Sequence, residues 1–131
     1  MKNSTRKVIT GIFAAAAITG LVSIASAADT YTDSNDDEFT YEKSGAGIQI
    51  TKVKDDGDGK VVVPAKIENI EISHIDIRDI GLSGLDVSKC TNISYLDCSG
   101  NQLTSLDLSN NTELIHVDCS NNKLTNLDFS N

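Results

Sequence analysis

The stretch that decides the fold is ISHIDIRDIGL (72–82), which returns as ISYLDCSGNQL (93–103) and as LIHVDCSNNKL (114–124). The three segments begin at Ile72, Ile93 and Leu114, so the interval between them is constant. All of them fit L-x-x-L-x-L-x-x-N-x-L, where L stands for any aliphatic residue or cysteine, and only Ile80 breaks the asparagine position. One segment alone cannot bury its apolar side, so we expect the segments to stack as coils around one continuous core.

The returns between these segments have a similar sequence. They read LSGLDVSKCTN (82–92), LTSLDLSNNTE (103–113) and LTNLDFSN (124–131). The period lies within the roughly 20 to 29 residues of leucine-rich repeats. The sequence therefore predicts a mostly β fold, a leucine-rich repeat solenoid of short parallel strands with irregular returns, over residues 72–131. We expect two full coils and a partial third, with the strands in the three segments quoted first.

Residues 1–27 have the pattern of a secretory signal peptide. Basic residues Lys2, Arg6 and Lys7 precede an apolar run over 8–22, and Ala25-Ser26-Ala27 supplies small residues for cleavage. A retained transmembrane anchor is the alternative, and the shortness of the run disfavours it. We therefore predict a secreted, extracellular or cell-surface protein with no membrane insertion after cleavage.

Two further regions separate the signal peptide from the repeats. Residues 28–38 are polar and acidic without periodicity, which predicts a disordered linker. Residues 39–71 contain three β-rich segments at 39–41, 47–53 and 61–63. Because a solenoid exposes its first coil, we expect 39–71 to form a small β-rich N-terminal cap.

The loop DDGDG (55–59) allows two interpretations, a tight hairpin turn and a calcium loop. An EF-hand loop needs acidic residues at alternate positions and a glutamate at the twelfth. Counted from Asp56, the fifth position is Lys60 and the twelfth is Ile67, so we favour a solvated turn. We predict no metal site and no cofactor.

The composition excludes some partners. The net charge is −8, and removal of the basic signal peptide leaves the chain more acidic still. An acidic protein repels phosphates and anionic lipid, so nucleic acid is not expected as a partner. The length corresponds to one domain with a small core.

Two pieces of the repeats, SYLDCSGNQLTSLDLSNN (94–111) and IHVDCSNNKLTNLDFSN (115–131), carry a family resemblance. They resemble internalin-type bacterial leucine-rich repeats, in the variant with 21-residue units in which cysteine replaces a core leucine. The resemblance covers 72–131. It implies a secreted or surface-associated binding protein, often an adhesin, rather than an enzyme, although fold alone does not fix function.

Cysteines and asparagines recur at fixed places in the coils. Cys98 and Cys119 share one slot on adjacent coils, about 4.8 Å apart. A disulfide is not forbidden at that spacing, but parallel inward side chains favour a ladder of buried thiols. Asn101 and Asn122 are expected to satisfy backbone groups in the turns. Cys90 is an odd third cysteine, either free or paired between chains.

The outward positions of the strands form the candidate site. One column contains His74, Tyr95 and His116, a second contains Asp76, Asp97 and Asp118, and Arg78 flanks them. We interpret these columns as a ligand-binding surface on the concave face, spanning 73–79, 94–100 and 115–121. For the aspartates a structural role is the alternative, because Asp86, Asp107 and Asp128 hold the same place in the returns. The two histidines are two strands apart, about 10 Å, too far to share a zinc ion.

Two functions remain open from the sequence. The first is a non-catalytic module that binds a protein ligand, and the alternative is a carbohydrate or cell-wall binding accessory or a fragment of a larger modular surface protein or hydrolase. No catalytic residue is predicted, because no serine or cysteine has a base within reach by coil geometry. Leu124, Leu127 and Phe129 would lie on an uncapped last coil, which predicts either a fragment or self-association.

Overall fold

The computed structural model describes residues 28–45 and 47–129, so the predicted signal peptide lies outside the described residues. The described chain consists of strands, turns and loops, and none of it forms a helix long and apolar enough to cross a membrane. The strands are β1 (Asp29–Thr32), β2 (Glu38–Ser44), β3 (Gly47–Lys54), β4 (Lys60–Val62), β5 (Lys66–Ile67), β6 (Ile70–Asp76), β7 (Gly84–Asp86), β8 (Tyr95–Asp97), β9 (Ser105–Asp107), β10 (His116–Asp118) and β11 (Asn126–Asp128).

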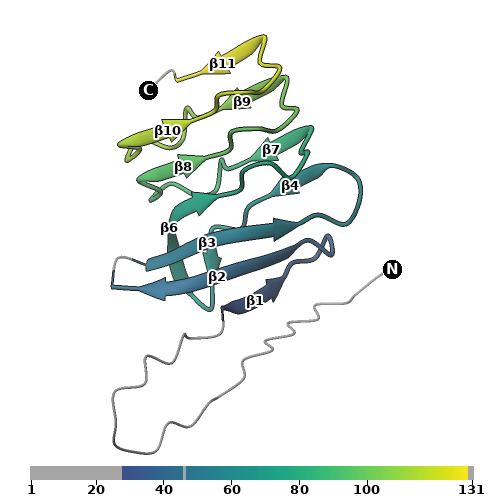
Figure 1. Ribbon diagram of the computed structural model, residues 1–131. Coiled ribbons are helices and arrows are strands. Elements are labelled where there is room, and N and C mark those ends of the chain that lie inside the picture. The colour runs from purple at the N-terminus through teal and green to yellow at the C-terminus, as the bar shows by residue number, and fades with distance from the viewer. Residues whose placement is uncertain (1–27, 46, 130–131) are drawn as a thin grey trace, which may run out of the picture.

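The repeat builds a stack of parallel coils, which confirms the mostly β solenoid (Figure 1). On one face, β6, β8 and β10 pair in parallel, and His74, Tyr95 and His116 are partners in register. These are the halves of the coils in which we expected the strands. The sheet continues on the N-terminal side in the order β1-β2-β3-β6-β8-β10.

The returns are more regular than the sequence led us to expect. Each return carries a three-residue strand, and these strands lie on the opposite side of the coils as the parallel pairs β4–β7 and β9–β11 (Figure 1). The reason is visible in the sequence, since the returns repeat the aliphatic-aspartate pattern of the first halves. On this second side the aliphatic residue of each strand points into the core. Leu106 is buried, and Leu85 and Leu127 are partly buried against the core.

The solenoid begins earlier than the sequence indicated and has about four turns. Strand β3 pairs in parallel with β6, and β4 pairs in parallel with β7, so the segment from β3 to β5 is itself a first coil. Its partners are Ile48 with Ile72 and Val61 with Leu85, an interval slightly longer than the one that separates the later coils. The loop 55–59 is therefore a corner between the two faces and not the tip of a hairpin.

The prediction of a disordered linker at 28–38 was wrong. Strand β1 pairs antiparallel with β2 and covers the outer edge of the sheet. The ring of Tyr31 lies 6.3 Å from the ring of Phe39, measured between centroids, so this acidic segment has an apolar anchor. Asp33 Oδ1 accepts the backbone N–H groups of Asn35 and Asp37 and closes the turn into β2.

The cysteines are thiols that pack inside the coils. Cys90, Cys98 and Cys119 are all free, which agrees with a thiol ladder and not with a disulfide. Burial raises the pKa of the thiols of Cys90 and Cys98 to about 12, so neither is a ready nucleophile. The Cys90 thiol donates to the carbonyl oxygens of Val63 at 3.7 Å and Pro64 at 3.4 Å. Cys90 is therefore buried within its own chain.

Asparagine side chains tie neighbouring coils together at their corners. Asn101 Nδ2 donates to the carbonyl oxygens of Ile77 and Cys98, both at 2.9 Å. Its Oδ1 accepts the N–H groups of Ile80 at 3.2 Å and Leu82 at 3.1 Å. One side chain thus forms hydrogen bonds with four backbone groups on two coils, which is the structural role that we expected for Asn101.

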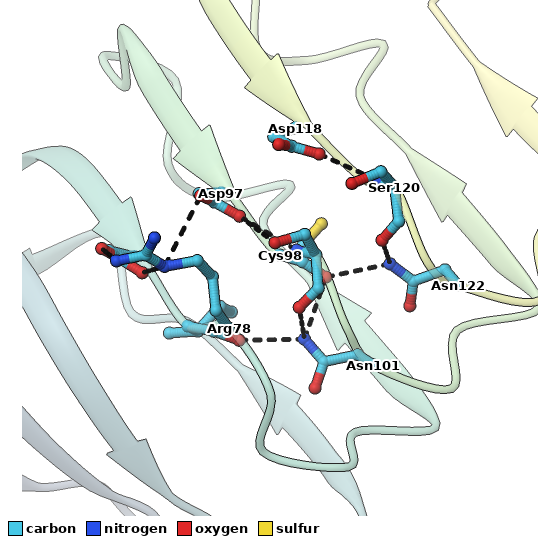
Figure 2. A network of polar contacts seen from close by, with 10 residues as sticks. Arg78, Asp97, Cys98, Asn101, Asp118, Ser120 and Asn122 are labelled. Carbon is cyan, nitrogen blue, oxygen red and sulfur yellow. Dashed lines mark hydrogen bonds and ion pairs between the residues drawn. The ribbon is translucent and has the colours of Figure 1, made fainter.

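The bonds of Asn101 recur one coil further on, and at the opposite corner Asn111 makes bonds through its Nδ2 only. Asn122 Nδ2 donates to Cys98 O at 2.9 Å (Figure 2) and to Cys119 O at 3.0 Å. Its Oδ1 accepts the backbone N–H of Leu103 at 3.0 Å. At the other corner, Asn111 Nδ2 donates to the carbonyl oxygens of Val87 and Cys90. We call Asn101, Asn111 and Asn122 the asparagine ladder.

Removal of one rung is expected to destabilise the whole stack. Asn101→Ala leaves buried carbonyl and N–H groups without partners, so the free energy of unfolding should fall by about 3 kcal/mol or more. Urea unfolding of the full chain followed by circular dichroism measures this loss. Asn126→Ala, at an exposed strand position, is the matched control and should change stability by less than about 0.5 kcal/mol. Equal effects of the two substitutions would contradict the ladder.

Asp37 gives the fold a defined pH dependence. Its side chain is 1% exposed. Burial, together with the like charges of Asp33, Asp56 and Asp55, raises its pKa from 3.8 to about 6. The folded state then binds a proton that the unfolded state has lost between about pH 4 and pH 6, so stability falls as pH rises through that window.

Asp37→Asn should remove this dependence. The amide oxygen can still accept the Asp56 N–H that Asp37 accepts at 3.1 Å. At neutral pH the variant should be more stable by about 1–3 kcal/mol, and its advantage should vanish near pH 4. Thermal unfolding across this pH range tests the expectation, with the exposed Asp58→Asn as the control. A variant less stable than the parent at every pH would show that the carboxylate is needed for the turn.

Candidate functional site

The three predicted ring residues lie together in one stacked column on β6, β8 and β10. The rings of His74 and Tyr95 have centroids 5.7 Å apart and an interplanar angle of 17°. The rings of Tyr95 and His116 are 4.7 Å apart at 9°. His74 and Tyr95 are half-buried and His116 is exposed. We call His74, Tyr95 and His116 the aromatic column.

The second face of the solenoid shows what the fold requires at this position. The residues in the place of the aromatic column are Gly84, Ser105 and Asn126, each followed by an aliphatic residue and an aspartate. The two faces share their sequence pattern and both consist of parallel strands, although on the second face the pairing is interrupted between β7 and β9. Residues without rings therefore suffice for the backbone at this position, and the aromatic column is an addition specific to one face.

Most aspartates of the second column have structural roles. Asp97 Oδ1 accepts the backbone N–H of Ser99 at 3.0 Å and the Ser99 hydroxyl at 2.7 Å. Asp118 Oδ1 accepts the Ser120 N–H at 2.9 Å, and the hydrogen bonds from Ser120, its hydroxyl first, lower the pKa of this carboxyl. These contacts support the structural interpretation of Asp97 and Asp118.

The aspartates of the returns make the same contacts on the second face. Asp107 accepts the N–H and the hydroxyl of Ser109 at 2.9 Å and 2.6 Å, and Asp86 accepts the Ser88 N–H at 2.9 Å. Side chains of this type close short turns by bonding to the backbone two residues on. The aspartate-x-serine pattern is therefore a turn device of both faces.

Asp76 and Arg78 depart from this device. Arg78 stands where later coils have serine, and its Nε and Nη2 donate to the two carboxylate oxygens of Asp76, each at 2.8 Å. Its Nε also lies 3.6 Å from Asp97 Oδ2 on the next strand (Figure 2). The hydrogen bond and the charge of Asp76 raise the pKa of Arg78. The coil that begins with β6 thus places an exposed ion pair beside the aromatic column.

A polar hollow of about 290 Å³ adjoins this ion pair. Its lining includes Thr51 and Lys52 of β3 together with Asp76, Arg78 and Asp79. Sequence reasoning missed the contribution of β3 to the surface, including Gln49, which is the register partner of His74. A bulge between Ile48 and Gln49 shifts the register, so these positions fall outside the constant interval of the later coils.

Asp55, Asp56 and Asp58 are the described residues whose spacing could hold a cation. Their carboxylate oxygens lie within 4.8 Å of one another. Each carboxylate already accepts a backbone N–H of the loop, at 2.8 Å from Gly59 to Asp55, 2.9 Å from Asp58 to Asp56 and 2.7 Å from Lys60 to Asp58. These bonds close the corner at 55–59, and the solvated turn stays a prediction.

The comparison with known proteins gave no relative for this chain. No protein-family model matches it, and no curated protein and no solved structure matches it significantly. The functional argument therefore rests on the residues and the geometry of this chain.

Proposed function

We propose that this protein is an exported, non-catalytic module that binds a protein ligand through one face of its solenoid. The binding face consists of the aromatic column (His74, Tyr95 and His116) and the adjacent pair Asp76 and Arg78. The observation that carries the proposal is that the two faces share one sequence pattern and parallel strands, and within the described part of the chain only this face presents stacked rings to solvent. The predicted signal peptide and the resemblance to internalin-type repeats support export and binding.

The geometry of the rings favours a protein over a carbohydrate. Sugars stack on the open face of an aromatic ring, whereas here the two faces of Tyr95 are covered by His74 and His116. The column therefore offers ring edges with polar tips, an array that suits mixed apolar and hydrogen-bonding contacts. Tyrosine and arginine are also the side chains that most often dominate protein–protein binding energy.

The asparagine ladder and the turn aspartates make the face rigid. Because the strands that carry the column are fixed by bonds between coils, the rings need little ordering on binding, which lowers the entropic cost. A repeated and rigid surface of this kind is suited to recognition rather than to bond making.

Substitution within the column tests the proposal. The immobilised full chain is screened against purified extracellular-domain proteins and soluble polysaccharides, and each binder is titrated by biolayer interferometry. Tyr95→Ser copies the residue that the second face has at this place, so the fold should persist. For a protein binder we expect affinity to fall about 30-fold or more, as for a hot spot worth about 2 kcal/mol.

Ser105→Ala, on the second face, is the matched control and should leave the affinity unchanged. If the chain binds only polysaccharides, the proposed protein ligand is wrong and the ligand is a carbohydrate. Equal loss in the Tyr95 and Ser105 variants would remove the aromatic column from the binding face.

A further inference from the structure

The polar hollow next to the ion pair of Asp76 and Arg78 lies between β3 and the turn that follows β6. Thr51 and Lys52 line it from β3, and residues 76–80 line it from the other side. Its volume of about 290 Å³ is just below the range of roughly 300–1,000 Å³ for pockets that enclose a whole small molecule. The hollow therefore has the size to receive one side chain of a partner.

A bulge in β3 brings the side chain of Lys52 to this hollow. The register of β2 against β3 shifts opposite Thr51, which is an extra residue between the paired residues Ile50 and Lys52. Ile50 and Val53 are buried, and the two residues between them are both exposed. In a regular strand these two neighbours would point to opposite faces of the sheet. The bulge therefore re-aims Lys52, as bulges beside binding sites commonly do.

The ammonium group of Lys52 has no counterion in the described part of the chain. Among residues 28–45 and 47–129, the ion pairs involve Lys43, Lys66 and Arg78 and leave Lys52 out. This cation faces a polar hollow instead of a neighbouring carboxylate. It is therefore available to a charged group of a partner.

Arg78 supplies a second cation to the lining of the hollow. Its Nε and Nη2 donate to Asp76, and Nε also lies 3.6 Å from Asp97 Oδ2, so the guanidinium is held in place (Figure 2). A guanidinium has five N–H donors, and those on Nη1 take no part in these contacts. Arg78 thus keeps donors for a partner without having to be ordered on binding.

The two acidic residues of the lining are directed away from Lys52. Both carboxylate oxygens of Asp76 accept hydrogen bonds from Arg78. Asp79 Oδ1 occupies the space that a Cβ at Gly100 would need, so this carboxylate lies over the coil of β8. Strand β8 and strand β3 are the opposite neighbours of β6 in the sheet. The side of the hollow formed by β3 is therefore its positive side.

We propose that the hollow receives a carboxylate side chain of the protein ligand, with Lys52 as the main anchor and Arg78 as the second donor. That the partner is a protein rests on the function proposed above. A single carboxylate matches one free ammonium group beside an arginine that is already paired with Asp76. The ligand segment would then combine an acidic residue at the hollow with residues that contact the ring edges of the aromatic column.

The surrounding charge disfavours a phosphate or a polyanion at this place. The chain carries a net charge of −8, and the carboxylates of Asp76 and Asp79 border the hollow. Each charge beyond the first on a ligand would meet this negative field without a further free cation in the lining. The hollow therefore fits an acidic side chain better than a phosphate group or an acidic polysaccharide.

Nuclear magnetic resonance of the isotope-labelled full chain tests the hollow without any protein ligand. The probe is N-acetylglutamate amide, which carries one carboxylate, and N-acetylglutamine amide is its neutral isostere. We expect the backbone signals of Thr51, Lys52 and Arg78 to shift saturably with the first probe and not with the second. Signals that do not saturate with the carboxylate probe, or that respond equally to both probes, would overturn the inference.

Lys52→Gln should weaken binding of the carboxylate probe by about 3- to 5-fold, the size expected for one exposed ion pair. Lys54→Gln is the matched control, because it removes the same charge from the same strand and Lys54 does not line the hollow. Both lysines are exposed, so both variants should keep the circular dichroism spectrum of the parent. Equal losses in the two variants would reveal a general effect of net charge and would contradict a site at Lys52.

Two further probes, inorganic phosphate and oligogalacturonate, identify the ligand class. Tighter binding of either probe than of N-acetylglutamate amide, at the same backbone signals, would replace the acidic side chain by a phosphate or an acidic polysaccharide. Because these titrations use no protein ligand, the hollow can bind the carboxylate even if the proposed function fails. Conversely, a protein binder that is weakened by Tyr95→Ser but not by Lys52→Gln would support the aromatic column and overturn the role of the hollow.

Discussion

The stack depends on the satisfaction of buried backbone groups at the corners of each coil. At each corner of a solenoid the chain turns sharply between neighbouring coils. The backbone N–H and C=O groups of that corner are buried from water and have no strand partner. Asn101 meets this demand with both ends of its amide, and Asn122 does so on the next coil. At the opposite corner Asn111 contributes through its Nδ2 alone. Burial of the aliphatic columns then follows, because the coils are held at strand spacing.

The same arrangement separates structural from functional positions on the surface. On both faces an aspartate carboxylate accepts the backbone N–H of the serine two residues later and so closes the turn that follows the strand. The outward position before each buried aliphatic residue accepts no such bond from a turn serine, and on β7, β9 and β11 of the second face it holds Gly84, Ser105 and Asn126. The fold leaves this position free to vary, and on β6, β8 and β10 it carries His74, Tyr95 and His116.

The sequence was sufficient to predict the regular coils and the aromatic column, because both follow from residues that recur at a constant interval. It was not sufficient for the first coil, where a bulge beside Ile48 and a longer interval to the next coil remove the period. Strand β1 was missed because its polar side chains belong to an edge strand anchored by one ring, Tyr31. The bidentate contact of Arg78 with Asp76 depends on side-chain geometry that spacing alone does not define.

The central claim is that the aromatic column is not needed for the fold, which is held by the asparagine ladder and the buried columns. The most direct measurement is the unfolding free energy of His74→Gly/Tyr95→Ser/His116→Asn, in which the column takes the residues of the second face. Each ring contact is worth about 0.5–1 kcal/mol, so we predict a folded protein whose stability falls by no more than about 2 kcal/mol. An unfolded variant, or a loss as large as that of Asn101→Ala, would contradict the account and make the column part of the framework.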